Sequence, residues 1–203
     1  MSDFDKKAQD WDKEKMHFDR SQAIADEMIK MFPKSKHMTA LEYGAGTGIL
    51  SFMLKDTFEH ITMMDSSSEM IAVTNKKIVD SNAKNMTAIF HDLETKPYNE
   101  QFDIIYNQMV MHHVVDIDKI FDSFKTLLKP NGYLVIADLY PEDGSFHGEG
   151  FIGHLGFEVE FLAAKLMNKG FKTGLHKTCY TLKKPNALGE IKEYPIFLIV
   201  AQI

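Results

Sequence analysis

The segment TALEYGAGTGILSFMLKD, residues 39–56, constrains the fold of this chain more than any other part of it. A short apolar run ends at Glu42, glycines follow at 44, 46 and 48, and the pattern then becomes that of an amphipathic helix. Glycine has no Cβ, so it tolerates positive φ and lets bare backbone come close to a ligand. The segment therefore predicts a strand, a ligand-binding loop and a helix in succession.

The same alternation continues along the chain. Short apolar runs predict strands at 38–43, 60–65, 86–90, 102–107 and 133–138. Helical spacing separates them, most clearly at Ile117, Ile120, Phe121, Phe124, Leu127 and Leu128. Strands joined by helices cross over and lie parallel, with helices on both faces of the sheet. We therefore expect an α/β fold with a doubly wound, Rossmann-like, mostly parallel sheet.

The two ends of the chain depart from this alternation. Residues 171–184 and 194–203 have the pattern of strands with no convincing helix between them, which predicts an antiparallel C-terminal hairpin and seven strands in all. Residues 1–37 precede the first strand and predict one or two helices that form a cap or lid. We expect a single domain over 1–203, with its Rossmann-like core at 38–203.

Charge and cysteine content narrow the classes of partner. The net charge of -6 argues against nucleic acid and against an anionic membrane surface, and favours a small-molecule partner. The charged start lacks the apolar region of a signal peptide, and no apolar run reaches the ~18 residues of a membrane span, so we expect a cytoplasmic protein. One cysteine, Cys179, allows no disulfide within the chain and no thiolate metal cluster. Oligomeric state is left open.

The spacing of the glycines bears on the choice of cofactor. A dinucleotide-binding GxGxxG motif counted from Gly44 would need glycine at position 49, which is Ile49. Counted from Gly46, the third place is Ser51. An NAD-type oxidoreductase is therefore disfavoured, but it stays open as an alternative.

The motif formed by Glu42, Gly44, Gly46 and Gly48, with the order of the later elements, resembles the class I S-adenosylmethionine-dependent methyltransferases over nearly the whole chain. This resemblance implies the cofactor S-adenosyl-L-methionine, the product S-adenosyl-L-homocysteine and methyl transfer to an unidentified small molecule. In that family the glycine loop lies under the methionine half of the cofactor, with the acidic residue near its ammonium group. A module that binds the cofactor without catalysis is a second alternative.

Later segments supply the rest of the implied cofactor site. Asp65 ends the second strand, where a carboxylate accepts hydrogen bonds from ribose hydroxyls. The segment FHDLETKPY resembles the adenine-binding turn, and FDIIYNQMVMHHVVD resembles the segment that lines the sulfonium, with Asn107 and Gln108 at the strand exit. The implied cofactor residues are Glu42, Gly44, Ala45, Gly46, Asp65, Ser66, Met70, Asp92, Leu93 and Asn107.

Candidates for the acceptor side come from the segments after the fourth and fifth strands. His112 and His113 follow the fourth strand and are candidates for a general base, with a purely structural histidine pair given equal weight. Other side chains that could surround the acceptor are Tyr106, Tyr140, Phe146, His147 and His154. Folding could bring His112, His113, His147 and His154 together as metal ligands, but their spacing is not diagnostic. We therefore expect no metal.

Overall fold

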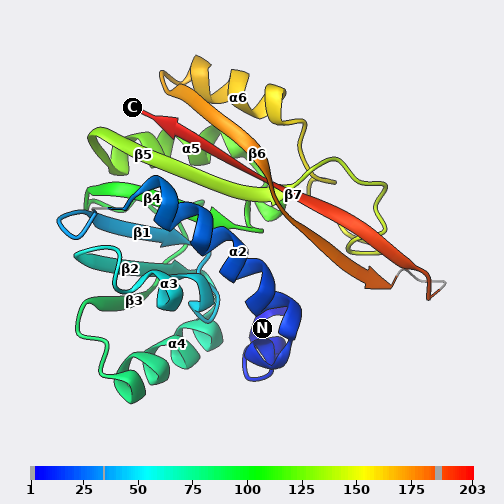
Figure 1. Ribbon diagram of the computed structural model, residues 1–203, viewed down its shortest axis with the longest axis horizontal. Helices are drawn as coiled ribbons and strands as arrows, with labels where there is room; N and C mark the ends of the chain where they lie inside the picture. Colours follow the sequence, from blue (N-terminus) through cyan, green and yellow to red (C-terminus); the bar gives the residue numbers. More distant parts are fainter. Residues whose placement is uncertain (1–2, 34, 186–188) are drawn as a thin grey trace.

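The computed structural model describes residues 3–33, 35–185 and 189–203, and in these ranges one seven-stranded sheet has the order β3-β2-β1-β4-β5-β7-β6 (Figure 1). The strands are β1 (Thr39–Tyr43), β2 (His60–Asp65), β3 (Met86–Phe90), β4 (Phe102–Gln108), β5 (Leu128–Leu139), β6 (Lys172–Pro185) and β7 (Ile191–Gln202). β1 to β5 pair in parallel, and β7 pairs antiparallel with both β5 and β6. The predicted doubly wound sheet with an antiparallel C-terminal hairpin is confirmed.

β5 begins earlier than the sequence predicts. The expected strand covered 133–138, after a turn at Lys129 and Pro130, but the strand begins at Leu128. Leu128 pairs with Phe102, and the register then shifts before Ile104 pairs with Tyr133. Asn131 has a φ of 64° inside this irregular stretch. The predicted turn is therefore part of the strand, as an irregularity in the pairing of β4 with β5. An apolar pattern does not reveal such an irregularity.

Helices cover both faces of the sheet (Figure 1). Residues of α2 (Lys15–Met31) and α3 (Ile49–Leu54) pack with Ala40 and Ile104 on one face, joined by Ile78 of α4 (Ser68–Ser81). α5 (Ile117–Leu127) and α6 (Val159–Asn168) pack with Leu41 and Ile105 on the other. Because side chains alternate along a strand, each central strand contributes to both cores.

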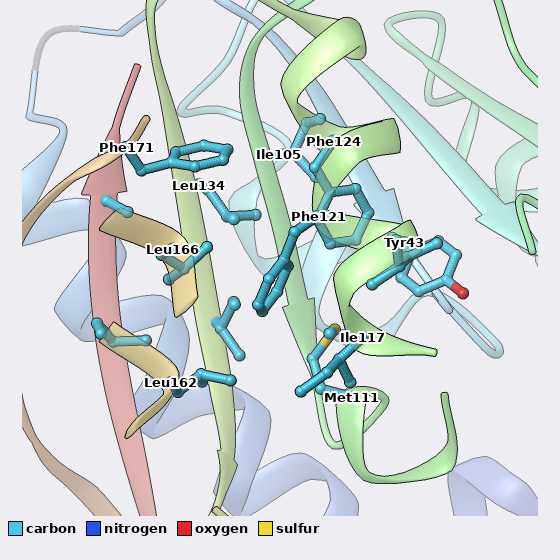
Figure 2. Packing of buried hydrophobic residues seen from close by; sticks show 14 of the residues in the cluster. Tyr43, Ile105, Met111, Ile117, Phe121, Phe124, Leu134, Leu162, Leu166 and Phe171 are labelled. Atoms are coloured by element: carbon cyan, nitrogen blue, oxygen red, sulfur yellow. The ribbon is translucent and has the colours of Figure 1, made fainter. Parts of the chain in front are cut away.

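α5 shows how the pattern builds the core. Asp116 caps the helix by accepting a 3.0 Å hydrogen bond from the amide of Lys119. The apolar stripe then faces the sheet, where Phe121 and Phe124 are fully buried (Figure 2). The ring of Phe124 meets that of Tyr43 edge to face, with 5.2 Å between centroids. This packing holds the carboxyl end of β1 in place.

The N-terminal segment lies beside the sheet edge at which β1 ends. It contains α1 (Asp3–Lys7), a short 3-10 helix η1 (Trp11–Lys13) and α2, as the sequence predicts for the region before the first strand. α2 packs along α3 and β6. No helix in the described ranges combines the length and apolar content needed to cross a bilayer.

Candidate functional site

A cavity of about 980 Å³ lies at the carboxyl ends of the parallel strands. Its walls come from the loops after β1, β2, β3, β4 and β5 and from the N-terminal segment. Open α/β sheets bind ligands at this edge, and the volume is at the upper end of the roughly 300–1,000 Å³ typical of small-molecule sites. It has room for a nucleoside-sized cofactor together with a small second substrate.

The glycine loop forms the floor of the cavity. Gly44 has a φ of +68°, and a Cβ there would lie 2.5 Å from a methyl of Val110. Gly46 has a φ of +55°, and a Cβ there would have only two neighbours, both at 3.9 Å, on Met70 and Trp11. Glycine at 44 therefore allows the loop to pack on the segment after β4, and glycine at 46 leaves bare backbone facing the cavity.

Asp65 connects the end of β2 to the glycine loop. One carboxylate oxygen accepts a 2.7 Å hydrogen bond from the amide of Gly46, and the other accepts a 2.8 Å bond from the amide of Ser67. Burial raises the pKa of Asp65, and these backbone donors oppose that rise. The carboxylate lines the cavity with acceptor capacity left over.

Eight of the ten predicted cofactor residues line this cavity. They are Gly44, Ala45, Gly46, Asp65, Ser66, Met70, Asp92 and Leu93. Asp92 forms a turn in which it accepts hydrogen bonds from the amide of Glu94 at 3.0 Å and the hydroxyl of Thr95 at 2.9 Å. The other two predicted residues, Glu42 and Asn107, lie outside the cavity wall.

Glu42 points away from the cavity, toward α3. It is fully buried and accepts a hydrogen bond from Ser51, whose hydroxyl also lies 2.6 Å from the hydroxyl of Tyr106. Burial raises the pKa of Glu42 from 4.5 to about 8, so the carboxyl is largely protonated at neutral pH. Its Oε1 has no hydrogen-bond partner among the described residues. Tyr106, considered above for the acceptor side, is a core residue instead.

We expect Glu42→Gln to stabilise the cofactor-free protein increasingly as the pH rises from 5 to 9. The folded state holds the Glu42 proton to about pH 8, while the unfolded chain releases it near 4.5. Wild-type stability therefore falls across this window by up to ~1.4 kcal/mol per pH unit, and glutamine removes that loss. Urea unfolding at several pH values measures the difference.

Glu59→Gln, at an exposed position just before β2, is the control for the change of net charge. It should leave the pH dependence of unfolding as in the wild type. A Glu42→Gln variant with the wild-type slope between pH 5 and 8 would show that Glu42 ionises normally in the folded protein.

The amide that reaches the cavity at the end of β4 is Gln108 and not Asn107. Gln108 lines the cavity and exchanges a 3.0 Å hydrogen bond with Ser21 of α2. Asn107 is 1% exposed on the opposite side of the strand, and among the described residues neither polar atom of its amide has a partner. Side chains alternate along a strand, so the two neighbours face different layers.

Arg20 is a cavity residue that sequence analysis missed. It belongs to the buried face of α2, lines the cavity and is only 6% exposed. Burial lowers the pKa of Arg20 to about 10, so it remains cationic at neutral pH, and its Nε has no partner among the described residues. The available signal was an arginine within the buried stripe of α2, in register with Ile24 and Met28.

His112 is held in one orientation by Asp138 of β5. Both side chains are buried, and His112 Nδ1 lies 2.6 Å from a carboxylate oxygen of Asp138. The same carboxylate accepts hydrogen bonds from the amides of Leu139 at 2.7 Å and His112 at 3.3 Å. With Nδ1–H donated to Asp138, His112 Nε2 keeps a lone pair, and among the described residues this atom has no partner.

Two further histidines gather around His112. The ring centroid of His112 lies 4.2 Å from that of His113 and 5.0 Å from that of His147. Burial, followed by the nearby His112, lowers the pKa of His113 to about 3 and that of His147 to about 4. Both imidazoles are therefore neutral at pH 7, and His113 is a weak candidate for a general base.

The remaining candidates for the acceptor side differ in whether they line the cavity. Phe146 lines the cavity with the three histidines, whereas neither Tyr140 nor His154 does. His154 Nε2 lies 3.0 Å from the carbonyl of Val114, and the hydroxyl of Tyr140 accepts a hydrogen bond from Thr178. His154 therefore helps to shape the segment after β4 without joining the cluster.

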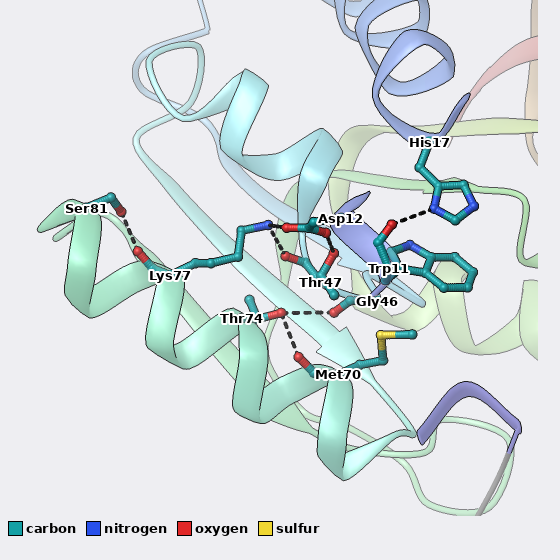
Figure 3. A network of polar contacts seen from close by, with 9 residues as sticks. All are labelled: Trp11, Asp12, His17, Gly46, Thr47, Met70, Thr74, Lys77 and Ser81. Atoms are coloured by element: carbon teal, nitrogen blue, oxygen red, sulfur yellow. Dashed lines mark hydrogen bonds and ion pairs between the residues drawn. The ribbon is translucent and has the colours of Figure 1, made fainter. Parts of the chain in front are cut away.

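The N-terminal segment is tied to the glycine loop and α4 by a polar network (Figure 3). Asp12 of η1 forms a 2.7 Å ion pair with Lys77 and accepts a hydrogen bond from the hydroxyl of Thr47. Lys77 also donates to the carbonyl of Thr47 at 2.8 Å, and Thr74 donates to that of Gly46 at 2.9 Å. These contacts hold Trp11 in the cavity wall.

The chain is similar in sequence and in fold to proteins described as methyltransferases. It is 30% identical over 128 residues to an uncharacterized methyltransferase of Schizosaccharomyces pombe, a match covering 59% of this chain and 45% of that protein. It is 32% identical over 115 residues to an uncharacterized methyltransferase of Staphylococcus carnosus, covering 55% and 52%. The chain thus spans about half the length of these curated relatives.

A solved structure gives the same result for the fold. The S-adenosylmethionine-dependent methyltransferase of Aquifex aeolicus superposes with a TM-score of 0.63 at 20% identity, covering 88% of this chain and 89% of that one. The methyltransferase domain family matches residues 16–167, from α2 through α6. This match decides against an NAD-type oxidoreductase and confirms the resemblance drawn from the glycine motif. The chain belongs to the methyltransferase domain family.

Proposed function

We propose that the cavity binds S-adenosyl-L-methionine and that the protein transfers its methyl group to a small-molecule acceptor. The observation that carries this proposal is the order of groups along the cavity wall. Arg20 of α2, whose Nε has no partner among the described residues, lines the cavity, bare glycine backbone follows β1, and a carboxylate follows β2. The amino acid part, the sulfonium link and the ribose of the cofactor would meet these groups in this order.

Different residues of the cavity wall would bind different parts of the cofactor. Arg20 would bind the carboxylate of the methionine moiety, because it lines the cavity, stays cationic at neutral pH and has an Nε without a partner among the described residues. Gly44 and Gly46 would admit the chain of the cofactor, Asp65 would accept hydrogen bonds from the ribose hydroxyls, and the turn at Asp92 and Leu93 would hold the adenine.

Positioning is the main contribution expected from this chain. The cofactor supplies a methyl group already activated by a positively charged sulfur. Aligning an acceptor with that group converts a bimolecular reaction into an effectively unimolecular one, which can contribute ~7 kcal/mol or more in favourable cases. The N-terminal segment, which lines part of the cavity, would limit the entry of water, and the His112 cluster would contact the acceptor.

Calorimetric titration with S-adenosyl-L-methionine, S-adenosyl-L-homocysteine and NAD tests the proposal directly. Micromolar binding of the first two without NAD is the expected result, and binding of NAD alone would contradict it. Incubation with labelled cofactor and candidate small hydroxyl, amine and thiol compounds then tests transfer. Tight cofactor binding with no labelled product from any class would favour the non-catalytic binding module.

We expect Arg20→Met to weaken S-adenosyl-L-methionine binding by about 10- to 100-fold, the range for a lost charge-assisted hydrogen bond in a partly dry site. Binding of 5′-methylthioadenosine, which lacks the amino acid part, should change little. Lys30→Met, at an exposed position on the same helix, is the control. Equal losses for both ligands would place Arg20 away from the carboxylate.

A further inference from the structure

The cluster of His112, His113 and His147 has a geometry that acceptor binding alone does not require. Each ring offers one nitrogen, and the three nitrogens lie within 4.8 Å of one another. The rings come from two separate segments, η2 (Met111–His113) and the loop after β5. A tetrahedral zinc ion with Zn–N distances of about 2.0–2.1 Å separates its nitrogen ligands by about 3.3 Å. An inward movement of about 1.5 Å would bring the three nitrogens to that spacing.

The loop that carries His147 is suited to such a movement. Gly148 has a φ of +85° and Gly150 a φ of +87°, and a Cβ at either position would meet no atom of the described residues within 4 Å. His147 is itself exposed, whereas His112 is buried and fixed by the sheet. Closure of the cluster would move His147 toward His112, which Asp138 already holds in place.

Asp138 fixes the tautomer and orientation in which His112 could bind a metal ion. Its carboxylate takes the Nδ1–H of His112, which directs the lone pair to Nε2, and that atom is buried without a partner among the described residues. Metal-binding histidines commonly donate their second nitrogen to a carboxylate in this way, which fixes both tautomer and ring orientation. A buried acceptor atom left without a donor is costly unless something binds it.

Aromatic rings enclose the other two imidazoles. Phe151 stacks on His147 with 3.9 Å between centroids and meets His113 edge to face at 5.3 Å. Phe4 of α1 meets the ring of His113 at 5.2 Å. These contacts restrict the rings without occupying the nitrogens, so the lone pairs stay available to a ligand between them.

We propose that His112, His113 and His147 bind one divalent transition metal ion, with zinc as the ion that best fits three imidazoles and an open fourth position. The open position would face the cavity, where the proposed methyl acceptor lies. The role of the ion rests on the proposed function: an acceptor hydroxyl bound to the metal loses its proton to water more readily. The new O–C bond then forms as the C–S bond of the cofactor breaks, and the sulfur keeps the electron pair.

Metal binding is tested on protein without a polyhistidine tag, stripped with a chelator and titrated with Zn²⁺ by calorimetry. Titration with Co²⁺, followed by visible absorption, reports the coordination geometry. We expect one ion per chain with micromolar or tighter affinity. His147→Gln changes an exposed loop residue, so it should fold normally and lose affinity by about 100-fold or more.

Two further variants sharpen the test. His176→Gln, at an exposed histidine of β6, should bind metal like the wild type. Asp138→Asn should weaken binding by about 10- to 100-fold if Asp138 orients His112 as a positioning residue. Zn²⁺ affinity unchanged in His147→Gln, or no binding at one ion per chain by the wild type, would overturn the proposal.

Cofactor titration of the metal-free protein separates this proposal from the previous one. A protein that binds S-adenosyl-L-methionine but binds no added metal ion would overturn the metal site and leave the proposed function standing. A protein that binds the metal ion but no S-adenosyl-L-methionine would support the metal site and contradict the proposed function.

Discussion

Gly156→Ala is expected to lower the free energy of unfolding by about 4 kcal/mol, among the largest effects for a single substitution. Gly156 has a φ of +78°, which costs an L-residue roughly 1–2 kcal/mol. A Cβ at this position would also lie 2.1 Å from the carbonyl oxygen of Tyr140, which is backbone and cannot rotate away. The chain would have to shift at the end of β5, where Phe157 donates a hydrogen bond to Leu139.

Gly189→Ala provides the matched control for backbone conformation. Gly189 has a φ of +80°, but a Cβ there would meet no atom of the described part of the chain within 4 Å. The free energy of unfolding of this variant should therefore fall only by the cost of a positive φ, about 1 kcal/mol. Chemical denaturation of both variants measures the comparison, and similar losses in the two would show that the close approach at Tyr140 is relieved at little cost.

Asp65→Ala is expected to weaken S-adenosyl-L-methionine binding by about 100-fold or more. The substitution removes the carboxylate proposed to bind the ribose, and it also removes the acceptor of the Gly46 and Ser67 amides. Loss of a charged hydrogen-bond partner costs about 1.5–3 kcal/mol, and a loosened glycine loop adds to that. Calorimetric titration measures the dissociation constant.

Folding of the Asp65 variant is checked separately by thermal unfolding, with Asp56→Ala as an exposed control on the same chain. Because Asp65 is a carboxylate at a strand end, its loss leaves both apolar cores intact. A folded Asp65→Ala protein with an unchanged dissociation constant would remove Asp65 from the cofactor site.

The sequence predicts much of this fold because its signals are local. An apolar run such as 60–65 identifies a buried strand without reference to the rest of the chain, and the stripe from Ile117 to Leu127 identifies a helix face. The glycine motif likewise specifies its own backbone, since positive φ and close approach are properties of positions 44 and 46 themselves.

Features that depend on the third dimension were harder to predict. Glu42 and Asn107 were assigned to the cofactor site from a motif, but strand alternation directs their side chains into the layers beside the cavity. Arg20 lines the cavity because α2 packs along α3, and this contact between two separate segments is not visible in the sequence. His112 and His147 are far apart in sequence, and only the path of the loop after β5 brings their rings together.

The ion pair between Asp12 and Lys77 bears on how fast the protein can turn over. η1 is held against Thr47 and α4, and residues of the N-terminal segment line the cavity, so we expect this segment to lie between a ligand on the glycine loop and solvent. Exchange of spent cofactor for fresh would require these contacts to open in every cycle. We therefore expect the opening of this segment, and not the chemical step alone, to set an upper limit on the catalytic rate.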